Sequence, residues 1–264
     1  MSGRAFRAIL AQWRAAWMAA LQYRSNFLAD TLVTALWVGW TIVPLWFVFH
    51  RAPERLAGWS YDESLLVTGF FMMLQGVLEA LIEPNLRGLV EHVRHGTLDF
   101  VLLKPVDSQV LVSFGRVVPA KAMLSVGGLV VVLVGIARLP VAPDLGALLV
   151  APVLLMAGLA ALYGLWLLVV STSFWFVRVD NLSYLLTSIL DAGRWPMGLY
   201  RPALRAILTF VVPVGIMTTW PALALRGLMR PTDVAVSLTI AATMLVTSRL
   251  VWRRAVASYT SASS

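Results

Sequence analysis

Long apolar runs dominate this sequence and constrain its fold more than any other feature. Several of them approach the roughly 20 residues that a helix needs to cross a bilayer, which excludes a barrel of short alternating strands. Hydrophobic residues make up 59% of the chain and charged residues only 13%, which is too apolar for an ordinary soluble domain. The sequence therefore predicts an all-α integral membrane protein, with residues 1–264 forming a single transmembrane domain.

Six membrane spans are expected. Five of them cover roughly residues 27–49, 64–82, 117–137, 146–170 and 234–252. The remaining span begins near Phe174, because the segment from Asn181 to Asp191 alone is too short to cross a bilayer.

Two further segments are expected at the membrane surface or only partly within it. Residues 1–25 predict an amphipathic helix on the cytoplasmic leaflet, with an ordinary helix packed on protein as the alternative. Within 194–230, three breaks at Pro213, Gly215 and Pro221 predict a re-entrant pair of short helices instead of a span.

The basic residues indicate how the chain is oriented. With both termini cytoplasmic, thirteen of the 21 basic residues fall on the inner side, namely Arg4, Arg7, Arg14, Arg24, Arg87, Arg94, Lys104, Arg116, Lys121, Arg178, Arg249, Arg253 and Arg254. The exceptions cluster in the external segment at Arg194, Arg201, Arg205, Arg226 and Arg230. The excess of basic residues on the inner side therefore supports the predicted topology of the first four spans clearly and that of the last third of the chain poorly.

Residues 84–105 form the only long charged insert between apolar segments. Its helical spacing separates an apolar stripe from a charged face: Leu86, Leu89, Val90 and Val93 against Arg87, Glu91 and Arg94. Asn85 is the expected N-cap, and Gly96 is expected to end the helix in a left-handed conformation. A helix this short cannot be a span, so it must lie on the surface or bind a partner.

Polar residues at two places in the apolar segments are candidate site residues. Gln75, Glu79 and Glu83 share one face of the second span, which should meet other helices, a water-filled path or cations such as Arg116 or Lys121. They would line a substrate path or form a structural ion-pair seam, and both interpretations stay open. Asp191 and Arg194, three residues apart, are expected to neutralise each other.

Several chemistries lack their motifs. The sequence has no G-x-x-x-x-G-K-[ST] phosphate loop, no cysteine and no spaced nucleophile and base, so neither ATP hydrolysis nor an intramembrane enzyme is expected. His92 and His95 are too few for a metal site. The net charge of +8 is attributed to membrane topology instead of nucleic acid.

Four segments carry a resemblance to a known family: GTLDFVLLKPVD at 96–107, SFWFVRVDN at 173–181, DAGRWP at 191–196 and TFVVPVGIMTTWPALALRG at 209–227. They resemble permease subunits of type 2 ATP-binding-cassette (ABC) exporters, in the bacterial branch whose permease is a stand-alone chain. The resemblance implies six spans, a coupling helix after the second, and a place in the cytoplasmic membrane. It also implies two copies of a separate ABC ATPase that binds ATP and Mg, and a second permease, identical or a paralogue.

The resemblance makes an exporter permease the leading hypothesis, with residues 86–95 as the coupling helix. The alternative is a non-transporting membrane anchor that recruits a cytoplasmic ATPase. An anchor needs neither broken helices nor a polar line along a span, and both features count against it.

Overall fold

A computed structural model of the chain describes residues 3–51, 55–104, 106–176 and 180–259. Pro105 and Arg178, named above, lie outside these residues. The described α-helices are α1 (Gly3–Gln22), α2 (Arg24–Arg51), α3 (Tyr61–Val77), α4 (Glu83–Arg94), α5 (Asp99–Leu102), α6 (Ser108–Phe114), α7 (Pro119–Ala137), α8 (Leu145–Ser171), α9 (Asp180–Leu190), α10 (Pro202–Ala206), α11 (Val214–Leu225) and α12 (Pro231–Ala257). Shorter turns are the π-helical η1 (Leu78–Ile82) and η5 (Ile207–Val211) and the 3-10 turns η2 (Thr172–Phe174), η3 (Asp191–Arg194) and η4 (Met197–Leu199).

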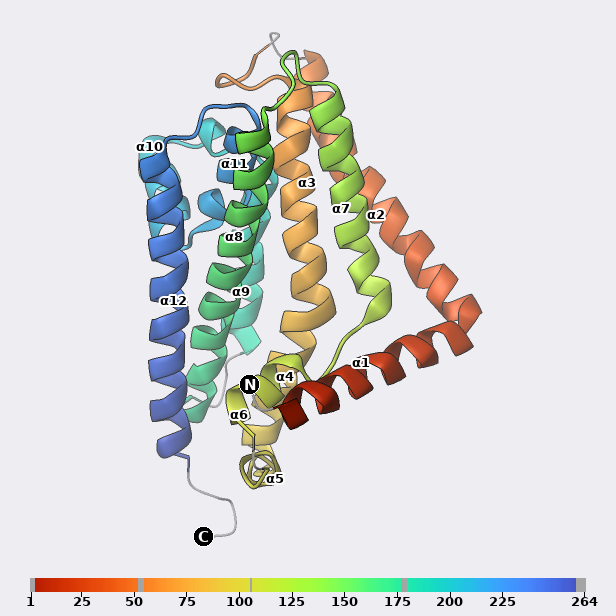
Figure 1. Cartoon of the computed structure of the whole chain (residues 1–264), viewed down its shortest axis with the longest axis vertical. Coiled ribbons are helices and arrows are strands. Elements are labelled where there is room, and N and C mark those ends of the chain that lie inside the picture. Colours follow the sequence, from red (N-terminus) through yellow and green to blue (C-terminus); the bar gives the residue numbers. More distant parts are fainter. Residues whose placement is uncertain (1–2, 52–54, 105, 177–179, 260–264) are drawn as a thin grey trace.

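The long helices stand roughly parallel. Helices α3, α7, α8 and α12 form a tall bundle, and α2 leans away from it (Figure 1). Helix α1 runs from the lower end of α2 back to the bundle, where α4, α5 and α6 also gather. The beginning of α1 and the end of α12 both lie toward this lower end.

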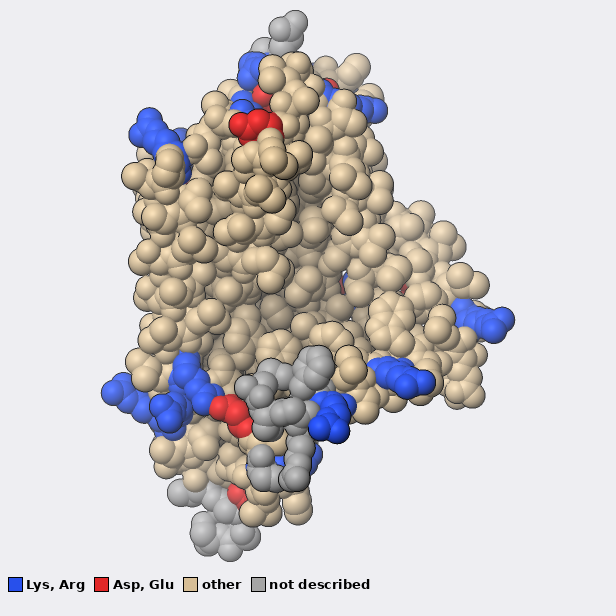
Figure 2. Space-filling view, in the orientation of Figure 1, with Lys and Arg blue, Asp and Glu red and all other residues tan. Residues whose placement is uncertain are grey.

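The membrane character of the fold is confirmed. Among the described residues, five helices are long and apolar enough to cross a bilayer, or six if the bent pair 202–211 and 214–225 counts as one span. On the face shown in Figure 2, Lys and Arg gather toward the upper and lower ends and a broad band of other residues separates them. The chain is an all-α, multi-pass membrane protein.

The second span and the predicted coupling helix are one continuous helix instead of two. Helices α3 and α4 join through η1 into a 34-residue helix from Tyr61 to Arg94. At 1.5 Å per residue it is about 51 Å long, so it extends well beyond a hydrocarbon core of about 30 Å. The expected N-cap at Asn85 is therefore wrong, because the helix does not begin there.

Glycines let the long helices approach closely. A side chain on Gly128 of α7 would lie 2.7 Å from the Gly69 carbonyl oxygen of α3, and Gly158 and Gly164 of α8 similarly meet the backbones of α11 and α12. Small residues of this kind are typical of helix interfaces in membranes. They divide the bundle into a pair, α3 with α7, and a group of three, α8 with α11 and α12.

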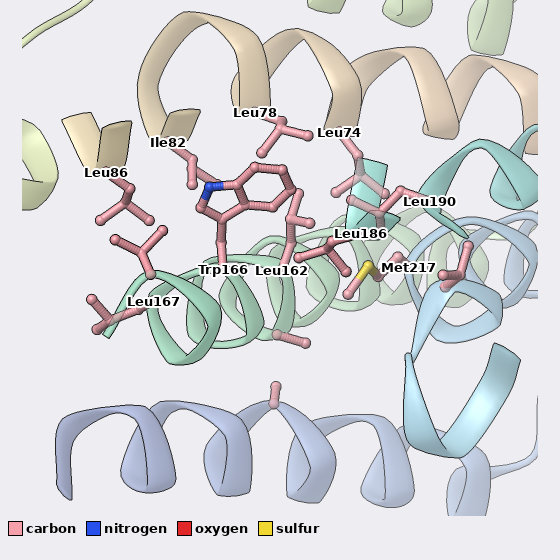
Figure 3. Close-up of a cluster of buried hydrophobic side chains, with 14 of the residues drawn as sticks. Leu74, Leu78, Ile82, Leu86, Leu162, Trp166, Leu167, Leu186, Leu190 and Met217 are labelled. Carbon is pink, nitrogen blue, oxygen red and sulfur yellow. The ribbon is translucent and has the colours of Figure 1, made fainter. Parts of the chain in front are cut away.

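A buried apolar cluster joins these two groups. Leu74, Leu78, Ile82 and Leu86 form a stripe along the α3–α4 helix that packs on Trp166 and its neighbours on α8 (Figure 3). The side chains of α9 and Met217 of α11 close the other side of the cluster. The apolar stripe of α4 is therefore part of the protein core.

The chain between α8 and α12 breaks more often than predicted. Helix α9 has 11 residues and covers about 17 Å, half of a bilayer, and Phe174 belongs to η2 instead of this helix. The segment predicted to be a re-entrant pair consists of two helical segments that meet at 97°, a geometry that a broken span would share. Its bend lies at Pro213, whereas Pro221 continues inside α11.

Candidate functional site

A cavity of about 320 Å³ lies between α2, α3, α7 and η3. Gln75 and Glu79 of α3 and η1 line it, and so do Asp191 and Arg194 of η3. The two polar groups that the sequence singles out separately therefore meet in one cavity. Its volume is in the range of small-molecule sites, and charged groups inside a membrane domain mark functional sites by default.

Glu79 is paired on both carboxylate oxygens. Gln75 Nε2 donates to Glu79 Oε1 over 2.8 Å, and Lys121 Nζ of α7 lies 2.9 Å from Glu79 Oε2. Lys121 is thus the cation of the polar line, whereas Arg116, the other candidate, lies outside the cavity. Because Lys121 is about half exposed, its ion pair with Glu79 is accessible from the cavity.

Pro84 explains why Lys121 reaches Glu79. Proline has no N–H, so the Ala80 carbonyl four residues earlier receives no helical hydrogen bond from it. Instead, the Val118 N–H donates to the Ala80 oxygen over 2.9 Å. This bond fixes the beginning of α7 beside η1, and it places Lys121, three residues later, next to Glu79.

The predicted pair Asp191–Arg194 is present but loose, with 3.5 Å between Arg194 Nη2 and Asp191 Oδ1. Thr68 Oγ1 donates to the Arg194 carbonyl over 3.2 Å and holds η3 against α3. The Arg194 guanidinium also lies 5.4 Å from the ring centre of Phe71. Its Nε is buried and has no hydrogen-bond partner among the described residues, so this arginine has unused donor capacity.

Glu83 does not line the cavity, and of the two interpretations of the predicted line it fits the structural ion-pair seam. It lies one turn beyond Glu79 and forms an ion pair with Arg87 on α4. Conversely, the sequence reasoning missed the wall that α2 contributes, where Thr34, Trp37 and Thr41 line the cavity. Their spacing of three and four residues in an apolar span was the available signal.

The residues proposed for the ATPase interface divide into two sets. The side chains of Leu86 and Leu89 are fully buried in the chain's own core, with exposed fractions of 0%. They cannot fill a groove on a partner, so their assignment to the interface is corrected. Val90 and Val93 are half-buried against the same core, and only Arg87, Glu91 and Arg94 are exposed.

The segment after α4 presents apolar side chains that the sequence reasoning did not single out. Gly96 ends α4 at a φ of 65°, as predicted, and the Thr97 N–H donates to the His92 carbonyl. Beyond this turn, Phe100 of α5 is 70% exposed and Leu103 is 81% exposed. Their place in the GTLDFVLLKP run was the signal available in the sequence.

A family model described as "ABC-2 family transporter protein" matches residues 36–263. The chain belongs to this family. No curated protein and no solved structure matches it. The permease resemblance is thereby confirmed at the level of the ABC-2 family, and the match leaves only α1 and the first part of α2 outside.

In this ABC-2 permease, polar contacts tie the lower segment to the spans. Arg249 of α12 forms a two-point ion pair with Asp107, which caps α6, and donates to Gln109 over 2.7 Å. Gln109 in turn donates to the Tyr163 hydroxyl of α8 over 3.0 Å. The hydrogen bond from Arg249 is the main reason that the pKa of Asp107 lies below its ordinary value.

At the opposite end of the molecule, an arginine that was an exception to the predicted distribution of basic residues has a structural role. Arg226, after α11, lies 3.1 Å from Glu63 of α3 and donates to the Gly58 carbonyl over 3.2 Å. Its guanidinium carbon lies 4.3 Å from the ring centre of Trp59. We call these four residues the Arg226 tie. They join the loop before α3 to the end of α11.

Proposed function

We propose that this ABC-2 permease moves a substrate through the cavity around Glu79 and Arg194, driven by ATP that a separate ABC ATPase binds and hydrolyses. The observation that carries the proposal is the convergence of two ion pairs and an interrupted helix in one cavity. Interrupted helices at membrane depth are tolerated where they line a cavity or are covered by protein, and transporters build binding sites from them.

The continuous α3–α4 helix supplies the mechanical link. A partner that moves the exposed face of α4 also moves Glu79, because no loop separates the two parts of the helix. The Val118–Ala80 bond passes that movement to α7, and Asp107–Arg249 passes it to α12. Access to the cavity would then alternate between the two sides of the membrane.

The ATPase would bind at the lower end, which we place on the cytoplasmic side because the beginning of α1, the end of α12 and the predicted basic excess lie there. Its contact surface combines the charged face of α4 (Arg87, Glu91 and Arg94) with the apolar tip of α5 (Phe100 and Leu103). Two ATPase copies and a second permease, identical or a paralogue, would complete the transporter in the bacterial cytoplasmic membrane. Exposed aromatic and apolar side chains with a charged rim are typical of such docking sites.

Docking is tested by copurification with the ATPase. The double variant Phe100→Asp with Leu103→Asp should lose the ATPase without a change in melting temperature, because both side chains are exposed. Leu89→Asp is the matched comparison, since it buries a charge in the core and should lower the melting temperature. Retention of the ATPase by the double variant would contradict the docking surface.

The absence of cysteine makes alternating access directly testable. A Thr34→Cys variant places one thiol in the cavity, and a membrane-impermeant maleimide can be added from either side of sealed vesicles. Export predicts that ATP, in the presence of the ATPase, shifts labelling from one side to the other. Val141→Cys, in an exposed loop, is the control whose labelling should not respond to ATP.

The same measurement distinguishes export from a membrane anchor. An anchor would recruit the ATPase and yet leave the labelling of Thr34→Cys unchanged by ATP. That result would refute the transport proposal even if copurification succeeded.

A further inference from the structure

A second, apolar space adjoins the polar cavity. It is a groove of about 520 Å³ between α2 and α7, lined by side chains such as Val38, Ile42, Met123 and Val130. Val130 is 54% exposed, so the described helices leave much of this side of α7 uncovered. Because α7 is a candidate span, the groove lies at the depth of the lipid chains.

Thr34 of α2 lines both the groove and the polar cavity. The two spaces therefore meet at this residue, one mainly apolar and the other containing two acids and two bases. A single molecule that occupies both must combine an apolar chain with a charged or polar head.

The charges of the cavity indicate what kind of head fits. Glu79 already has one partner on each oxygen, Gln75 on Oε1 and Lys121 on Oε2, so its charge is balanced within the protein. Arg194 lines the cavity with about a third of its side chain exposed and contacts Asp191 only over 3.5 Å, so its guanidinium can donate to an anionic group there. Asp191 is half exposed and engages Arg194 through only one oxygen, which leaves the other oxygen for a cationic group.

We propose that the substrate is an amphipath with a zwitterionic headgroup, an inference that rests on the export function proposed above. Its anionic group binds Arg194 and its cationic group binds Asp191 in the cavity. Its apolar chain lies in the α2–α7 groove, past Thr34. The substrate enters sideways from the bilayer, and the cavity with its equal numbers of acids and bases selects against heads of one sign.

The proposal is tested with three photoreactive lipids that share a diazirine acyl chain and carry a phosphoethanolamine, a phosphoglycerol or an uncharged glycerol head. Each is added to the purified full chain in nonionic detergent, and crosslinks to residues 123–134 are mapped by mass spectrometry. We expect the phosphoethanolamine lipid to label this part of α7 most strongly.

Matched variants separate the groove from the head site. Val130→Trp should remove most of the labelling, whereas Leu129→Trp, equally on the helix surface but outside the groove, should not. Arg194→Gln should weaken binding of the phosphoethanolamine lipid about tenfold, as expected for one lost charged hydrogen bond, without affecting the uncharged lipid. Arg201→Gln, outside the cavity, is its control.

Equal labelling by all three lipids, or equal effects of the two tryptophan variants, would overturn the proposal and leave only annular lipid in the groove. Protection of the groove by a second copy of the chain, in a crosslinked dimer, would also overturn it. These binding measurements need no ATPase. Transport without selective labelling refutes this inference alone, whereas labelling without ATP-dependent access refutes export and reduces the site to lipid binding.

Discussion

Replacing Arg226 by glutamine tests the Arg226 tie. The side chains of Arg226 and Glu63 are only 10% and 6% exposed, so the variant leaves a buried carboxylate without its main partner. Breaking a buried ion pair in this way costs about 3–5 kcal/mol. The lower end applies here, about 3 kcal/mol, because Glu63 keeps the Ser60 N–H at 2.8 Å and an exposed Arg55 at 3.6 Å.

Thermal unfolding in detergent measures this loss. At roughly 2–4 °C per kcal/mol for a chain of this size, the melting temperature of Arg226→Gln should fall by about 6–12 °C. Arg201→Gln removes an exposed arginine and should change it by little. A shift for Arg226→Gln no larger than that of Arg201→Gln would refute the reasoning.

A double variant separates the ion pair from simple loss of packing. Combining Glu63→Gln with Arg226→Gln removes both charges, so no uncompensated charge stays buried. The double variant should therefore be more stable than Arg226→Gln alone. If the two effects simply add, the pair carries no coupling and the stability of this region comes from the Trp59 contact instead.

Three further predictions concern the cavity, the lower network and the helix interface. Lys121→Gln should slow transport more than tenfold, because Glu79 loses its cation and keeps only the hydrogen bond from Gln75, whereas Arg116→Gln, outside the cavity, should not. Asp107→Asn should lower the melting temperature at neutral pH. The pKa of Asp107 is lower in the folded chain than in the unfolded chain, where it is about 3.9. The stabilisation by Asp107 is therefore complete above that unfolded pKa and is lost as the pH falls through the folded pKa. The melting temperatures of the wild type and Asp107→Asn should converge in acid. Gly128→Leu should destabilise the chain by about 1–3 kcal/mol or more in thermal unfolding, whereas Gly39→Leu, with open space around it, should not.

The polar residues of the cavity could be predicted from the sequence, but their convergence could not. Glu79 and Asp191 interrupt apolar runs, and the cost of a charge in a membrane makes each of them a visible anomaly. They are more than a hundred residues apart, and the packing of η3 on α3, which includes the bond from Thr68, brings them together. Periodicity within one helix contains no information about such a contact.

The α4 stripe shows a different limit of sequence patterns. Its spacing correctly predicted one apolar and one charged face, but an apolar face does not state which surface covers it. If this helix were a separate element on the surface, a partner protein would be needed to bury Leu89. Because the helix is continuous with α3, its stripe extends that of α3 onto α8, and the chain covers its own apolar face.

Pro84 is central both to the ion pair in the cavity and to the burial of the α4 stripe. Read alone, a proline after an apolar run predicts the end of a span and a new helix. Here the freed Ala80 carbonyl is bonded by Val118 from the next segment, and a π-helical turn precedes the proline, so the helix passes through it without ending. The same exchange of one hydrogen bond makes α3–α4 a continuous lever and sets Lys121 beside Glu79. Pro84, which the sequence pattern would read as a helix boundary, thus lies in the helix that connects the proposed docking surface with the cavity.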